Sequence, residues 1–87
     1  GHAHKQCREL VVAVSGSFTV TLTDGQTRST HLLNRPFQAL LIETGVWRTL
    51  EDFSSGAVCL VLAEDPFDES DYIRNYDEYL KFIGKTK

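Results

Sequence analysis

Residues 9–25, ELVVAVSGSFTVTLTDG, decide the fold of this 87-residue chain. The run at 9–14 is rich in valine, and the run at 18–22 alternates large apolar residues with threonine, the period-two pattern of a strand. The dipeptide Asp24-Gly25 that follows is a strong hairpin signal, because glycine tolerates the positive φ of a tight turn. We therefore expect two neighbouring strands here, with the second returning through a hairpin.

The same alternation of strand and turn continues to residue 64. Strand patterns cover 26–33, 37–43, 46–53 and 57–64, and between them stand the turn residues Asn34-Arg35-Pro36, Thr44-Gly45 and Ser54-Ser55-Gly56. Six short strands without intervening helices are typical of an antiparallel sandwich or barrel. We see no linker or repeat, so we expect residues 1–87 to form a single domain.

After Pro66 the pattern changes to that of a helix. Apolar and aromatic residues fall on one helical face; they are Tyr72, Ile73, Tyr76, Tyr79, Leu80 and Ile83. Ser70 or Asp71 could cap the start of this helix. We therefore expect an all-β domain that ends in a short helix.

Composition excludes several classes of function. The net charge of −3 argues against a general nucleic-acid surface, which would show clustered lysine and arginine. The longest apolar run, at 57–63, is far shorter than a membrane span, and no signal peptide is visible. Cys7 and Cys59 show no metal or redox spacing and are expected to be reduced thiols. These features favour a cytoplasmic protein that binds neither nucleic acid nor a membrane.

The opening GHAHK carries the clearest chemistry. His2 and His4 are two residues apart, so on a strand their side chains share one face. With Glu9 and Gly16 they match the first signature of the cupin superfamily, and we expect Glu9 to reach the same interior from the neighbouring strand. Two imidazoles and a carboxylate are suitable ligands for iron, manganese, nickel or zinc.

The second cupin signature should supply a third histidine, and here it does not. In the matching stretch, ETGVWRTLED, the histidine position holds Arg48. Arginine stays protonated and cannot ligate a cation, so we expect no metal and no other cofactor. Histidine is the side chain best matched to proton transfer near neutral pH. We expect His2 or His4 to remove a proton alpha to a carbonyl, with Arg48 as an electrostatic partner for the enolate oxygen.

Four stretches together resemble the dTDP-sugar 3,4-ketoisomerase family, cupins that also occur fused to acyltransferases in WxcM-like proteins. They are GHAHK, VAVSGSFTVTLTDG, GVWRTLEDFSSGAVCLVLA and FDESDYIRNYDEYL, and they cover essentially the whole chain. The resemblance implies a jelly-roll barrel, a homodimer with exchanged N-terminal strands, and metal-independent transfer of the keto group of dTDP-4-keto-6-deoxyglucose from C4 to C3. Such isomerases supply deoxysugars for lipopolysaccharide and other glycans.

Carried over residue by residue, the resemblance makes His2 and His4 the catalytic pair. Arg48 and Glu9 are expected to face the substrate, and Trp47 either to contact it or to pack at the rim. The family usually has glutamine where this chain has Glu9, and it has further strands before HAHK that are not among these 87 residues. Two alternatives therefore stay open: a metal-binding cupin, suggested by Glu9, and a non-catalytic sugar-nucleotide-binding or dimerising module, suggested by the absent strands.

Overall fold

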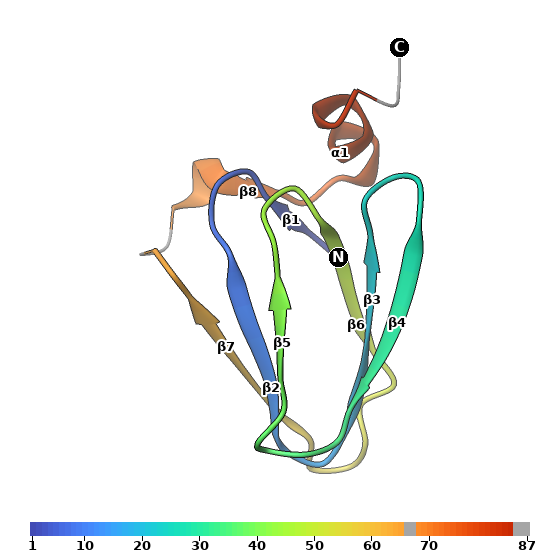
Figure 1. Ribbon diagram of the computed structural model, residues 1–87, viewed down its shortest axis with the longest axis vertical. Helices are drawn as coiled ribbons and strands as arrows, with labels where there is room; N and C mark the ends of the chain where they lie inside the picture. The colour runs from blue at the N-terminus through green and yellow to red at the C-terminus, as the bar shows by residue number, and fades with distance from the viewer. Residues whose placement is uncertain (66–67, 85–87) are drawn as a thin grey trace.

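Two three-stranded antiparallel sheets face each other in the computed structural model, which describes residues 1–65 and 68–84 (Figure 1). In one sheet, β2 (Glu9–Ser15) is the central strand. It pairs with β5 (Ala39–Ile42) on one side and with β7 (Val58–Ala63) on the other. Both pairings are antiparallel, and they join strands that are not consecutive in the sequence.

The second sheet is built around the hairpin that the sequence predicts. β3 (Phe18–Thr23) pairs with β4 (Arg28–Leu33) and with β6 (Trp47–Glu51). Gly25 has φ +94° in the turn between β3 and β4, where the Asp24 side chain accepts hydrogen bonds from two backbone amides. All six predicted strands are present, and the predicted all-β architecture is confirmed.

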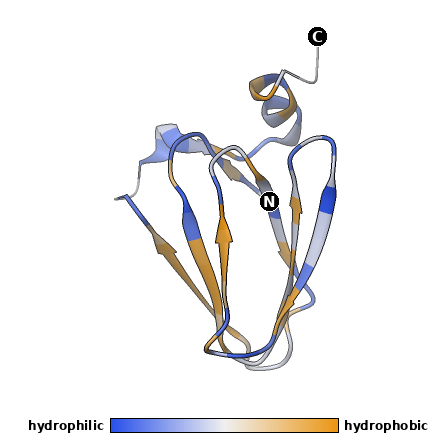
Figure 2. Cartoon of the chain, viewed as in Figure 1, coloured by the Kyte–Doolittle hydropathy of each residue, from blue (hydrophilic) through white to orange (hydrophobic). Residues whose placement is uncertain are grey.

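The hydrophobic core lies between the two sheets. Alternate residues of each strand point inward, and the buried set is Val11, Ala13, Phe18, Val20, Leu33 and Ile42. Apolar residues also run along the outward positions of β2, β5 and β7 (Figure 2). One face of that sheet is therefore apolar without being covered by any described residue.

The end of the chain differs from the predicted single helix. A 3-10 turn, η1 (Glu69–Asp71), is capped by Asp68, and β8 (Tyr72–Ile73) follows it. Only then does α1 (Tyr76–Phe82) begin, with the Asn75 side chain accepting a hydrogen bond from an amide of the first turn. The prediction that Ser70 or Asp71 caps the helix is therefore wrong. Tyr72 and Ile73 instead pair with β1 (Ala3–His4), which holds them in an extended conformation.

Tyr79 of helix α1 is buried and hydrogen-bonds to the β-sandwich. The Tyr79 hydroxyl lies 3.0 Å from the Thr23 carbonyl oxygen and 2.7 Å from that of Gly45. The amide of Gly45 in turn donates to the His4 carbonyl oxygen at 2.8 Å. The helix therefore supports the turn before β6, and that turn supports the strand that carries His4.

The state of the two cysteines and the length of the helices bear on the predicted environment of the protein. Cys7 and Cys59 are both free thiols, as predicted. Among the described residues, no helix has the length and apolar character needed to cross a membrane.

Candidate active site

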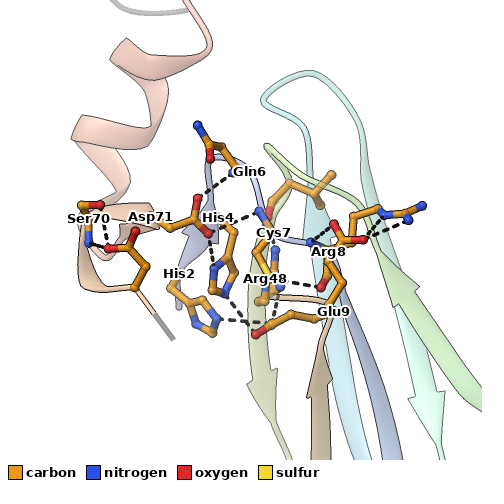
Figure 3. Close-up of polar contacts among 12 residues, drawn as sticks. His2, His4, Gln6, Cys7, Arg8, Glu9, Arg48, Ser70 and Asp71 are labelled. Carbon is orange, nitrogen blue, oxygen red and sulfur yellow. Dashed lines mark hydrogen bonds and ion pairs between the residues drawn. The ribbon is translucent and has the colours of Figure 1, made fainter. Parts of the chain in front are cut away.

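The histidine pair lies at one end of the sandwich, beside β6 and β8 (Figure 3). The His2 amide donates to the Arg48 carbonyl oxygen at 3.0 Å, and the Arg48 amide returns a bond to His2 at 2.9 Å. This pairing extends the β6 edge and holds the first residues of the chain as a strand. Both imidazoles then project to the same side, as the spacing predicts, with ring centroids 5.1 Å apart.

Arg48 and Glu9 form a buried ion pair beneath the two rings. The guanidinium Nη1 lies 2.6 Å from Glu9 Oε1, and the side chains are only 1% and 6% exposed. Nη2 donates to the Val46 carbonyl oxygen at 3.0 Å. Burial lowers the pKa of Arg48 and the Glu9 carboxylate opposes that effect, but a guanidinium remains charged in proteins. The predicted convergence of Glu9 and Arg48 with the histidines is present in the structure.

The Glu9 carboxylate also lies close to both histidines, each through a different oxygen. Oε2 lies 3.1 Å from His4 Nε2, and Oε1 lies 3.8 Å from His2 Nε2. The contact with His4 has the length of a hydrogen bond but not its direction, so among the described residues His4 Nε2 is buried without a hydrogen-bond partner. Glu9 therefore links Arg48 electrostatically to both imidazoles while leaving this nitrogen unsatisfied.

Asp71 is a site residue that sequence reasoning missed. Its Oδ2 accepts a hydrogen bond from His4 Nδ1 at 2.9 Å, and its carboxylate also accepts the amides of Gln6 at 2.7 Å and Cys7 at 3.3 Å. Burial acts to raise the pKa of Asp71, but the hydrogen bonds from His4 and the two amides outweigh it and lower the pKa. Asp71 is 67 residues from His4, so no local spacing could have indicated this contact.

Tyr72 also belongs to the site, although the sequence placed it on a helix face. Its ring centroid lies 4.3 Å from that of His4 and 5.5 Å from that of His2. Pairing of β8 with β1 sets Tyr72 opposite His4 in the register. Burial raises the pKa of Tyr72, and the Glu9 carboxylate adds to that rise. Its phenol therefore stays protonated at neutral pH.

Trp47 occupies a different position from its neighbour Arg48. Successive strand residues point to opposite faces, and the indole lies against Tyr76 and Tyr79 of α1 with centroids at 5.1 and 5.5 Å. A Cβ on Gly1 would come within 2.8 Å of the indole, so the first residue rests directly on this ring. These contacts are those of rim packing, and direct contact of Trp47 with a substrate stays a prediction.

Within residues 1–65 and 68–84, two sets of side chains could supply metal ligands by their chemistry. Ligand atoms of His2, His4 and Glu9 lie within 4.8 Å of one another, and so do those of His4, Cys7 and Asp71. Imidazole and carboxylate donors suit several divalent cations. The first set fits such an ion poorly, because Glu9 is already bound to the positive guanidinium of Arg48. The second fits poorly because Asp71 already accepts three N–H donors, one of them from His4.

The arrangement is suited to moving protons. Desolvation and the nearby Arg48 guanidinium lower the pKa of His2 to about 4, so His2 is neutral at neutral pH and offers a lone pair. His4 is held between two carboxylates, and His2, which is 30% exposed, lies on the side from which a ligand can enter. The two imidazoles can transfer protons, and the buried guanidinium beside them can stabilise negative charge.

Comparison with known proteins finds close relatives. The model of the family described as FdtA, WxcM-like, C-terminal, matches residues 1–84. A TDP-4-oxo-6-deoxy-alpha-D-glucose-3,4-oxoisomerase from Aneurinibacillus thermoaerophilus is 43% identical over 84 residues, which are 97% of this chain and 60% of that protein.

Solved structures agree with this relationship. A 3,4-ketoisomerase from Helicobacter canadensis is 41% identical with a TM-score of 0.91, over 94% of this chain and 62% of that one. A variant of a 3,4-ketoisomerase from Thermoanaerobacterium thermosaccharolyticum, solved with TDP-4-keto-6-deoxyglucose, is 38% identical with a TM-score of 0.92, over 97% and 61%. The predicted cupin-type fold is confirmed, and the chain spans about three fifths of the length of these relatives.

Proposed function

This chain belongs to the FdtA family of WxcM-like C-terminal domains, and from that premise we propose that the protein is a sugar-nucleotide isomerase. It moves the keto group of dTDP-4-keto-6-deoxyglucose from C4 to C3 in deoxysugar biosynthesis. Support comes from the relatives, whose names describe 3,4-oxoisomerases and 3,4-ketoisomerases, and from a neighbour that binds TDP-4-keto-6-deoxyglucose. The observation that carries the proposal is the pair of imidazoles, His4 buried and His2 partly exposed, over the Arg48–Glu9 ion pair.

The reaction requires only proton transfers. A base removes the proton from C3, and the electron pair moves toward the C4 carbonyl to give an enediolate. A proton is then added at C4 and another at the C4 oxygen, the C3 hydroxyl loses its proton, and C3 becomes the carbonyl carbon. Atoms and electrons balance within the sugar, so no cofactor or metal is needed. His2 and His4 perform the transfers, since imidazole is effective in general acid–base catalysis near neutral pH.

Arg48 and Glu9 set the charge of the site. The guanidinium favours negative charge that develops on the enediolate oxygens, because a buried charge acts through a low effective dielectric constant. Glu9 holds the guanidinium in place at 2.6 Å. We assign Trp47 to the rim, where its packing under Gly1 steadies the strand that carries His2.

We further propose that the protein acts in the cytoplasm as a homodimer, with residues 1–87 part of one cupin domain. Support for association comes from the apolar outer face of the β5–β2–β7 sheet, where Leu10, Leu41, Leu60 and Leu62 are 37–52% exposed. Burying such a face against a second copy removes apolar area from water. The net charge of −3 suits a role without nucleic acid.

Turnover can be followed directly on the sugar. The protein is incubated with dTDP-4-keto-6-deoxyglucose in deuterated water, and the sugar is observed by NMR. The expected result is a 3-keto product with deuterium at C4. His2→Asn and His4→Asn should each abolish product formation, whereas His31→Asn, the matched control on β4, should not.

The proposed isomerase activity is refuted if the assay shows no 3-keto product and no exchange of the C3 proton. Binding of dTDP without turnover would support the alternative of a sugar-nucleotide-binding module. Loss of activity in His31→Asn as well would show that the assay reports stability rather than the site.

A further inference from the structure

We propose that Asp71 is a positioning residue for His4, fixing a proton on Nδ1 and directing Nε2 into the barrel. The inference rests on the proposed function only for its kinetic consequence, because the geometry can be measured in the absence of substrate. Neither the strand pattern nor the histidine motif assigns any role to this carboxylate.

Asp71 is itself firmly held. Its Oδ1 accepts the Gln6 amide at 2.7 Å, and its Oδ2 is shared by His4 Nδ1 at 2.9 Å and the Cys7 amide at 3.3 Å. Its own carbonyl oxygen accepts the Lys5 amide at 2.9 Å. The carboxylate therefore cannot turn away from His4 without breaking bonds to the loop that follows the histidine. The side chain is only 12% exposed, so water competes little for these bonds.

A carboxylate accepts hydrogen bonds and donates none, so the His4 nitrogen that faces Asp71 carries a proton. In the neutral ring the lone pair is then on Nε2. That atom is buried and has no hydrogen-bond partner among residues 1–65 and 68–84, and Glu9 Oε2, at 3.1 Å, lies off its bonding direction. An unsatisfied buried nitrogen is costly in a resting site, and a substrate proton is the partner it lacks.

The Asp71 carboxylate also stabilises the His4 imidazolium that forms when His4 accepts a proton. When His4 takes a proton, the imidazolium has Asp71 against Nδ1 and Glu9 near Nε2. The aspartate of a serine-protease triad relates to its histidine in this way, holding the ring in one tautomer and stabilising the cation. In that template, replacement of the aspartate by asparagine keeps the geometry but reverses the tautomer, at a cost of about 10⁴-fold in turnover.

The tautomer is tested without substrate by ¹⁵N and proton NMR of His4. The protein should show a proton on Nδ1 that exchanges slowly. In Asp71→Asn that signal should disappear, because the amide can offer N–H to Nδ1. Asp68→Asn is the matched control, since Asp68 belongs to the same turn but its side chain bonds, among the residues that the structure describes, only to Ser70. If Nδ1 of His4 carries no proton in the wild-type protein, the proposal is overturned. This result can be obtained even if Asp71→Asn does not fold.

Kinetics provide the second readout. Asp71→Asn should lower kcat by about 10²- to 10⁴-fold with KM changed only a few-fold, and Asp68→Asn should leave both unchanged. An unaltered kcat in Asp71→Asn overturns the proposal. If the protein has the Nδ1 proton but no isomerase activity, the proposed function fails while the positioning by Asp71 stands.

Discussion

Two arginine–glutamate pairs of the same chemistry differ in burial, and this contrast gives a quantitative prediction. The Arg48–Glu9 pair is 2.6 Å long with side chains 1% and 6% exposed, whereas the Arg8–Glu64 pair is 3.0 Å long with side chains 48% and 39% exposed. Glu9→Ala leaves the Arg48 guanidinium buried without its partner. Glu64→Ala leaves Arg8 in water, where solvent takes the place of the carboxylate.

The expected cost of Glu9→Ala is about 3–5 kcal/mol, the range for removing one partner of a buried ion pair. A small protein has a urea m-value of about 1–2 kcal/mol per molar. The midpoint of urea unfolding should therefore fall by about 1.5 M or more in Glu9→Ala. Glu64→Ala should shift the midpoint far less, because an exposed pair contributes little.

Urea titration followed by circular dichroism measures both midpoints, and the double variant Glu9→Leu/Arg48→Met separates charge from packing. Apolar residues of similar volume can replace a buried pair at little cost, so the double variant should recover most of the lost stability. The reasoning is refuted if Glu9→Ala costs no more than Glu64→Ala, or if the double variant is less stable than Glu9→Ala.

Four further outcomes are expected. Tyr79→Phe removes a buried hydroxyl donor from the Gly45 carbonyl oxygen and should cost about 1–3 kcal/mol in urea unfolding, whereas Tyr76→Phe should cost much less. The pKa of His2 is lowered from 6.5 to about 4 in the folded state, so between these pH values the unfolded state binds more protons than the folded state. The free energy of unfolding should therefore fall as the pH drops from 6.5 to 4. His2→Asn should flatten that part of the stability–pH profile. Elemental analysis should find no stoichiometric transition metal in active protein, and a chelator should leave turnover unchanged. Leu62→Glu should shift sedimentation toward the monomer, and an unchanged dimer would exclude this sheet face as the interface.

The strands of both sheets could be predicted because their signals are local. Alternation along 18–22 and the Asp24-Gly25 turn depend on neighbouring residues only, and the hairpin that follows from them is present. The convergence of Glu9 and Arg48 on the histidines was predicted differently, from the positions that these two residues hold in the cupin signatures.

The end of the chain could not be predicted because a distant strand overrides its local pattern. Tyr72 and Ile73 fit one helical face together with Tyr79, but pairing with β1 holds them extended. Aromatic and β-branched residues fit a half-buried strand equally well, so the sequence alone cannot choose. The hydrogen bond from His4 to Asp71 depends on this pairing and was missed for the same reason.

The support of His4 from Gly45 and Asp71 has a consequence for biosynthesis. A chain emerging from the ribosome presents GHAHK before the six strands, and Asp71 and Tyr79 follow only after β7. Chains are synthesised in this direction at about 5–20 residues per second, so several seconds pass between the synthesis of the histidines and that of Asp71 and Tyr79. A chain interrupted after β7 carries both imidazoles but not the hydrogen bond between His4 and Asp71, so the proposed mechanism predicts that unfinished copies are inactive.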